Sequence, residues 1–76
     1  MNFLERRKIE KICKNLKYKY EFIKNSKSFI VYGKSDDNID LQYISEWFIS
    51  YMKDLGYYVS NVFYSNKLEV IFTKNR

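Results

Sequence analysis

Residues 17–22 (KYKYEF) alternate strictly between polar and aromatic side chains. Successive side chains of a β-strand point to opposite faces of a sheet, so this period of two predicts a strand with one buried face. A turn-forming stretch at residues 25–27 (NSK) separates it from a β-branched and aromatic stretch at residues 28–32 (SFIVY). The two stretches predict an antiparallel hairpin.

A helix is predicted immediately before this hairpin. Asn2 can cap its N-terminus, and Glu5 stands three residues later, which is the spacing of a capping box. Apolar residues then recur at the positions of one helical face: Ile9, Ile12, Cys13 and Leu16. The opposite face is basic and holds Arg7, Lys11 and Lys14, with Glu10 spaced to form an i, i+4 ion pair with Lys14.

The order of a helix followed by a hairpin is predicted again in the second half of the chain. Asp37 can cap the helix, with Asp40 at its third position. An apolar stripe follows over four turns: Leu41, Ile44, Trp47, Phe48, Tyr51, Met52 and Leu55. Within it, Trp47 and Phe48 are expected in the core. Gly56 stands where a left-handed residue would end the helix, and strands are predicted at residues 57–64 and 67–74.

These elements predict one α+β domain of residues 1–76 in the order α-β-β-α-β-β, with two similar halves at about residues 1–34 and 35–76. The arrangement that leaves all neighbours antiparallel places the fourth strand between the second and the third. Both helices then cover one face of the four-stranded sheet. This is a permuted ferredoxin-like sheet, with the first strand moved to the end. The sequential strand order is the alternative.

Alternation along the strands divides the sheet into two faces. Ten residues are expected to face the helices: Tyr18, Tyr20, Phe22, Phe29, Val31, Val59, Phe63, Leu68, Val70 and Phe72. The open face is expected to hold Lys17, Lys19, Glu21, Ile30, Tyr32, Tyr58, Ser60, Val62, Tyr64, Lys67, Glu69, Ile71 and Thr73. A shift of one residue in any strand would exchange these sets.

No pattern indicates catalysis, a metal or a cofactor, and none is expected. The chain has no histidine, and its single cysteine, Cys13, is expected to be a core thiol. Asp36 and its acidic neighbours lack the glycine and the glutamate that a calcium loop requires. One cysteine, no signal peptide and no membrane-length apolar stretch favour a cytoplasmic protein that does not insert into membranes.

The charge is divided along the chain. Residues 1–34 hold ten Lys and Arg against three Glu, a net charge of +7, while residues 35–76 hold four against six, a net charge of −2. The sum is the +5 of the whole chain. A surface polarised in this way favours macromolecular partners.

The expected function is therefore binding without catalysis. Size and composition are similar to those of small proteins from phages and mobile elements, including anti-CRISPR proteins. The preferred interpretation is an inhibitor or regulator that binds a host or cognate protein, such as a nucleic-acid-handling CRISPR effector, in the cytoplasm of the infected cell. The alternative is an RNA- or single-stranded-DNA-binding module that uses the basic helix and the Lys/Tyr-rich sheet face. Association of two copies of the chain into a homodimer is a further alternative.

Ten residues are predicted to contact the partner. They are the basic and tyrosine side chains of the first helix and of the open sheet face: Arg6, Arg7, Lys11, Lys14, Lys17, Lys19, Tyr32, Tyr58, Tyr64 and Lys67.

Overall fold

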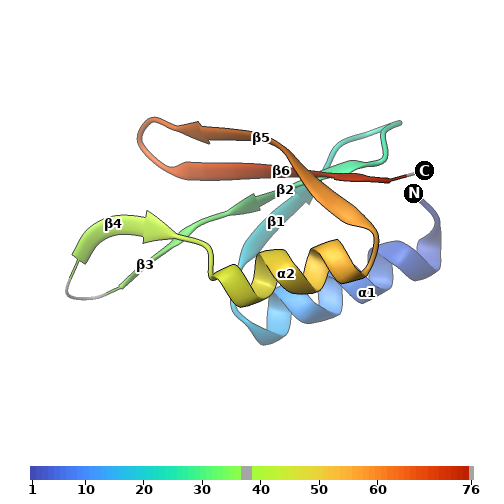
Figure 1. Ribbon diagram of the computed structural model, residues 1–76, viewed down its shortest axis with the longest axis horizontal. Helices are drawn as coiled ribbons and strands as arrows, with labels where there is room; N and C mark the ends of the chain where they lie inside the picture. Colours follow the sequence, from blue (N-terminus) through green and yellow to red (C-terminus); the bar gives the residue numbers. More distant parts are fainter. Residues whose placement is uncertain (37–38, 76) are drawn as a thin grey trace.

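The computed structural model describes residues 1–36 and 39–75, which form two helices, a four-stranded antiparallel sheet and a two-stranded ribbon (Figure 1). The elements are α1 (Phe3–Asn15), β1 (Lys19–Phe22), β2 (Ser28–Tyr32), β3 (Lys34–Asp36), β4 (Ile39–Tyr43), α2 (Glu46–Asp54), β5 (Tyr57–Tyr64) and β6 (Leu68–Lys74). The sheet has the order β1-β2-β6-β5, so the last strand in the sequence is a central one. The predicted α+β class and strand order are confirmed.

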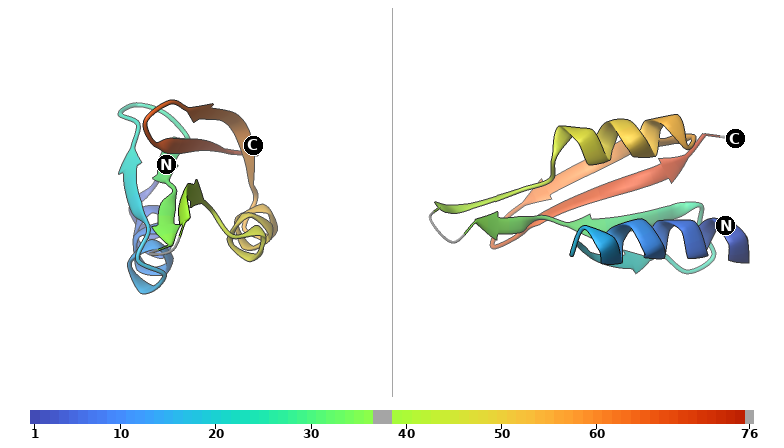
Figure 2. Two further views of the ribbon diagram at one scale, coloured as in Figure 1. Left: turned by 90° about the vertical axis from the view of Figure 1, so that its left-hand side faces the viewer. Right: turned by 90° about the horizontal axis from the view of Figure 1, so that it is seen from below.

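Both helices lie on the same face of the sheet. Figure 2 shows α1 beneath β1 and β2, and α2 beneath β5, with the two helices running in opposite directions. The other face of the sheet carries no helix. Neither helix in the described part of the chain has the length and apolar composition needed to cross a membrane.

The first helix begins and ends as its sequence predicts. The Asn2 side chain accepts a hydrogen bond from the backbone N–H of Glu5 at 2.9 Å, and the Glu5 side chain accepts one from the N–H of Asn2. After the helix, Lys17 adopts a left-handed conformation with φ of 62°. This turn delays the first strand to Lys19, so the prediction that Lys17 lies in the strand is wrong.

Aromatic side chains fill the core. Its buried members are Ile9, Cys13, Tyr18, Phe29, Val31, Phe48, Met52, Tyr57, Val70 and Phe72. Phe29 and Phe72 are directly opposite on β2 and β6, and their rings stack with centroids 5.3 Å apart. The Phe48 ring of α2 meets the edge of Phe72 at 5.8 Å. Large rings that interlock in this way give a short chain without a disulfide an apolar interior.

The predicted start of the second helix is wrong. Asp40 lies in β4, which pairs with β3 as an antiparallel ribbon, and Asp37 falls outside the described residues. The helix instead begins at Glu46, where the Ser45 hydroxyl accepts a hydrogen bond from the N–H of Phe48. It ends where predicted, because Gly56 follows with φ of 96°.

Contacts with distant parts of the chain hold the ribbon in place. The side-chain oxygen of Gln42 accepts a hydrogen bond from the N–H of Leu68, and the N–H of Ser45 donates to the Tyr18 hydroxyl at 2.9 Å. The second bond provides an acceptor for the backbone N–H of Ser45, just before the helix.

A β-bulge in β5 exchanges the two faces of that strand. The register with β6 shifts between Val59 and Asn61, and the hydroxyl of the extra residue, Ser60, donates to the carbonyl of Ile71. Val59 lies opposite buried Phe72 as predicted, but beyond the bulge Val62 lies opposite buried Val70.

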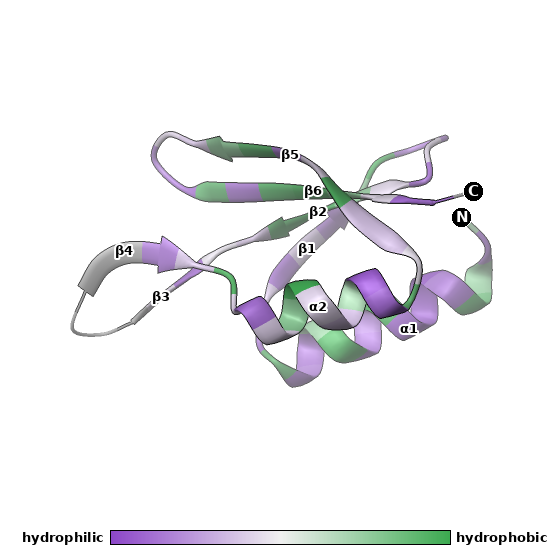
Figure 3. Cartoon of the chain, in the orientation of Figure 1, coloured by the Kyte–Doolittle hydropathy of each residue, from purple (hydrophilic) through white to green (hydrophobic). Residues whose placement is uncertain are grey.

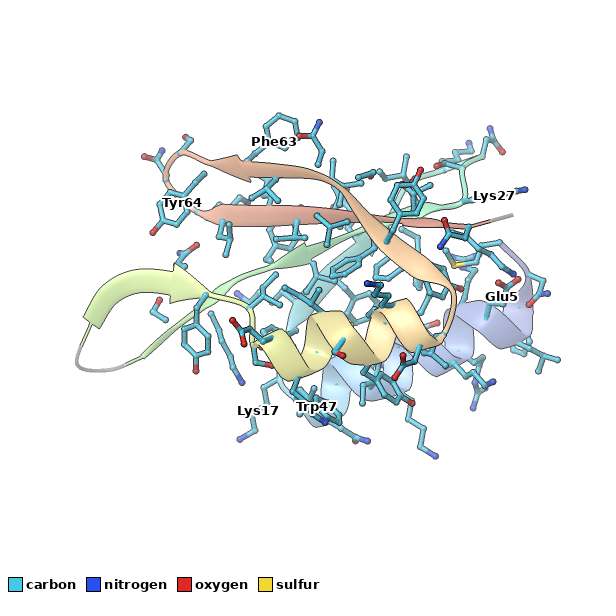
Figure 4. All side chains as sticks on the ribbon, viewed as in Figure 1. Glu5, Lys17, Lys27, Trp47, Phe63 and Tyr64 are labelled. Atoms are coloured by element: carbon cyan, nitrogen blue, oxygen red, sulfur yellow. The ribbon has the colours of Figure 1, made fainter. Side chains whose placement is uncertain are left out.

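Three face assignments in β5 are therefore wrong. Phe63 points to the open face rather than to the helices (Figure 4), whereas Val62 and Tyr64 point to the helix side. One inserted residue reverses every later side chain in a strand, since the side-chain period is two.

Candidate functional site

The basic stripe of α1 faces away from the core. Arg7, Lys11 and Lys14 are exposed, because Ile9 and Cys13 occupy the opposite, buried side of the helix. Hydrophilic residues predominate along this helix (Figure 3).

No carboxylate neutralises this stripe among the side chains that the structure describes. Among the described side chains, the one ion pair joins Glu5 to Lys74 of β6 and does not involve the stripe. The predicted Glu10–Lys14 pair does not form, since Glu10 instead accepts a hydrogen bond from the Tyr20 hydroxyl at 3.3 Å. The positive charge of Arg7, Lys11 and Lys14 is thus retained on the surface of α1.

An exposed aromatic pair lies on α2. The rings of Trp47 and Tyr51 stack with centroids 5.4 Å apart and planes inclined by 11°. Trp47 is 58% exposed and Tyr51 is 37% exposed, so the prediction that Trp47 belongs to the core is wrong. Phe48 and Met52 fill the buried side of the helix, and Trp47 lies about 100° around the axis from Phe48.

The flank of α2 that carries this pair leads to a residue beside α1. Trp47 and Tyr51 lie four residues apart on the helix, and Leu55, the C-cap residue, is four residues further on. Leu55 lines a hollow together with Glu5 and Lys8 of α1. Because the helices are antiparallel, Trp47 is at the end of α2 that corresponds to the C-terminal end of α1.

Figure 4 shows Trp47 and Lys17 both directed away from the sheet on the same side of the molecule. The Trp47 ring and the Lys17 side chain, just after α1, are therefore both exposed in the helix layer. The helix-layer surface is defined here as Arg7, Lys8, Lys11, Lys14, Lys17, Trp47 and Tyr51.

Three of the predicted contact residues meet at the other side of the molecule. Lys19 lies opposite Tyr32 on the open face of the sheet, and the Lys67 ammonium lies 4.6 Å from the centre of the Tyr32 ring. With Gln42 of the ribbon, they line an open hollow of about 680 Å³. Burial, aided by the nearby carboxylates of Glu21 and Glu69, raises the pKa of Tyr32 above its ordinary value.

The ten predicted contact residues do not form one surface. Tyr58 is on the open face but lies opposite Thr73, near the far end of β6 from Lys67. Tyr64 is on the helix side, where its hydroxyl accepts a hydrogen bond from the N–H of Gln42. Arg6 lies over the Phe22 ring at 4.9 Å, beside β1 rather than on the outward stripe.

Three members of the helix-layer surface are absent from the ten predicted contact residues: Lys8, which flanks the predicted stripe, and Trp47 and Tyr51. A signal for the aromatic pair was present. The apolar stripe of the second helix, with seven residues, is wider than one buried helical face, so its flank had to reach solvent.

The single cysteine is buried and is not activated as a nucleophile. Burial raises the pKa of the Cys13 thiol to about 12, so the thiolate that a nucleophile requires is scarce at neutral pH. Among residues 1–36 and 39–75, no three His, Cys, Asp or Glu side chains are grouped to hold a metal ion.

Comparison with protein families, with curated proteins and with solved structures finds no match to this chain. The function is therefore argued from the surface itself.

Proposed function

We propose that this protein binds RNA or single-stranded DNA through the helix-layer surface. The observation that supports it is the exposed Trp47–Tyr51 stack on α2, in the same helix layer as the exposed basic stripe of α1. Proteins that bind single strands combine cations along the phosphate backbone with aromatic rings on which bases stack. Each stacked base contributes about 1–3 kcal/mol to binding.

A single strand fits this surface better than a duplex. An aromatic ring can stack only on a base whose face is exposed, and base pairing in a helix hides those faces. The Trp47 ring is available for this contact because more than half of its surface is open to solvent. Arg7, Lys11 and Lys14 occupy successive turns of α1 and offer a line of charge to the phosphates.

The experiment uses Trp47 as the reporter, since it is the single tryptophan of the chain. Unlabelled oligo(U) or oligo(dT) of about 12 nucleotides, within the usual site size for single strands, is titrated while tryptophan emission is recorded. Stacking of a base on Trp47 is expected to quench the emission. With three phosphate contacts, affinity should fall about 20-fold between about 50 and 200 mM salt, because the slope is about −0.7 per contact.

A duplex of the same length is the matched control and should quench weakly. Absence of both quenching and binding at about 50 mM salt, where electrostatic binding is strongest, would contradict the proposal.

A host protein is the second candidate partner, and the same surface supports it. Trp, Tyr and Arg are the residues most enriched at the energetic centres of protein interfaces, and Trp47, Tyr51 and Arg7 are all exposed here. An inhibitor or regulator would use this surface to cover an acidic patch of its target. In that case the oligonucleotide leaves Trp47 emission unchanged, and a stoichiometric protein complex survives at about 300 mM salt.

A further inference from the structure

An open hollow of about 610 Å³ lies at the β1–β2 turn, and every charged side chain that lines it is basic. Arg6 lines it from α1, while Lys24 and Lys27 belong to the turn itself. No Asp or Glu is among its lining residues. Within residues 1–36 and 39–75 the only ion pair is that of Glu5 with Lys74, so no carboxylate neutralises these three cations by direct contact.

Two polar side chains of the hollow are held in position with donor groups to spare. The central carbon of the Arg6 guanidinium lies 4.9 Å from the centre of the Phe22 ring, whose face attracts the cation. The fork of N–H groups on a guanidinium matches the oxygens of a phosphate and can bind them through two parallel hydrogen bonds. The Ser26 hydroxyl accepts a hydrogen bond from the N–H of Ser28 at 3.0 Å, which leaves its own hydrogen to donate to a ligand.

The charge and size of the hollow favour a phosphate monoester over a carboxylate. Three cations around one hollow suit a ligand with more than one negative charge, and a phosphate monoester carries about −1.5 to −2 at pH 7. The volume is within the range of about 300–1,000 Å³ that is usual for small-molecule sites. Half-buried Phe22 and Ile23 form an apolar wall beside the cations, which suits the organic part of such a ligand.

We propose that this hollow binds a small phosphate monoester, such as a nucleoside monophosphate. Arg6 binds two of the phosphate oxygens, and Lys24 and Lys27 supply the remaining positive charge. Phe22 and Ile23 contact the organic part of the ligand.

The hollow is distinct from the helix-layer surface. None of the seven residues that define that surface lines the hollow. Figure 4 shows Lys27, at the turn, well separated from both Lys17 and Trp47. Binding of a phosphate monoester at the turn is therefore independent of whether the helix-layer surface binds a single strand.

Calorimetric titration with adenosine 5′-monophosphate tests the site, and adenosine is the matched control ligand. At about 50 mM salt, where screening is weak, the monophosphate is expected to bind with a Kd of about 1 mM or below. Adenosine should bind at least about ten-fold more weakly, because it lacks the phosphate that the cations contact. Equal affinity for the two ligands would overturn the proposal.

Single charge changes separate the hollow from the net charge of the protein. Arg6→Gln should weaken binding of the monophosphate about ten-fold, because it removes the bidentate contact. Lys53→Gln is the matched control, since it removes an exposed cation of α2 that does not line the hollow, and it should bind as the unmodified protein does. Equal weakening by the two variants would indicate that only net charge matters and would overturn the site.

Trp47 emission reports where the monophosphate binds. Because Trp47 is remote from the turn, its emission should stay unchanged while calorimetry records binding. Quenching in step with binding would place the ligand at the helix-layer surface and overturn the proposal.

Oligonucleotides distinguish a free monoester from the end of a strand, since both present the same group. No gain in affinity from a 5′-phosphate on oligo(dT) would identify a free monoester as the ligand. A gain that Arg6→Gln abolishes would identify the strand end, and a gain that Arg6→Gln leaves intact would overturn the assignment of this hollow.

Discussion

The side chain of Lys74, at the end of β6, forms an ion pair with Glu5 in the first turn of α1. The Tyr57 hydroxyl donates to the same carboxylate oxygen at 3.1 Å. Glu5 also completes the capping box, so one carboxylate joins the start of the first helix to the last two strands. The hydrogen bond from Lys74 is the main cause that lowers the pKa of Glu5 below 4.5.

Replacement of Glu5 by Gln should destabilise the protein at neutral pH. The pKa of Glu5 is lower in the folded state than in the unfolded state, so its stabilisation is complete above pH 4.5 and is lost as the pH falls through the folded value. Because the pair is partly exposed, Glu5→Gln should lower the free energy of unfolding by about 0.5–1 kcal/mol at pH 7. Urea unfolding at pH 7 and pH 3 measures this, and the difference between the two proteins should be smaller at the lower pH. Asp54→Asn, which removes a carboxylate without an ion pair, should show no comparable loss.

Removal of the Ser45 hydroxyl tests where the second helix begins. Ser45→Ala leaves the N–H of Phe48 without its acceptor and should cost about 0.5–2 kcal/mol of stability. Ser50→Ala, in the exposed middle of α2, should cost nothing, because Ala favours a helix interior. Thermal unfolding of both variants distinguishes them, and equal stability of the two would argue against the helix start at Glu46.

Truncation of Trp47 should weaken binding more than it weakens folding. Loss of one stacked base, about 1–3 kcal/mol, lowers oligonucleotide affinity roughly 5- to 150-fold in Trp47→Ala. The free energy of unfolding should change by less than about 1 kcal/mol, since most of the ring is exposed. Anisotropy of a labelled oligonucleotide gives the affinity. Tyr43→Ala removes an exposed aromatic ring of the ribbon and should leave the affinity unchanged.

Neutralisation of the α1 stripe should change the salt dependence of binding. The double variant Lys11→Gln, Lys14→Gln removes two phosphate contacts and should reduce the slope of log affinity against log salt by about 1.4. Lys24→Gln, Lys27→Gln makes the same change in net charge at the β1–β2 turn, at one end of the molecule (Figure 4). Identical slopes for the two double variants would indicate that only net charge matters, and the stripe would then not be the contact.

The sequence predicted the elements whose signals are local. The capping box of Asn2 and Glu5, the strand alternation of β2 and the left-handed Gly56 all depend on neighbours within a few residues. The ribbon was missed because long-range bonds from Gln42 and Ser45 hold it, and no local pattern records them. Asp37 and Asp40 have the spacing of a helix start, so the sequence alone predicted a helix where the structure has strand β4.

The sheet face on which each side chain of β5 lies could have been predicted more accurately. Its helix-side residues Val59 and Val62 are separated by three positions instead of two, and this interruption is the sequence mark of the bulge at Ser60. The site was harder to predict. That Trp47 lies in solvent follows from where α2 begins, so the error in the helix start carried over into the prediction for Trp47.

The central place of β6 has a consequence for biosynthesis. The β1–β2 hairpin and β5 touch opposite sides of this one strand and cannot be joined before residues 68–74 have been made. Until that segment has left the ribosome, the Phe72 ring is missing from its contacts with Phe29 and Phe48. A chain cut short before residue 68 would lose the middle of the sheet rather than its border.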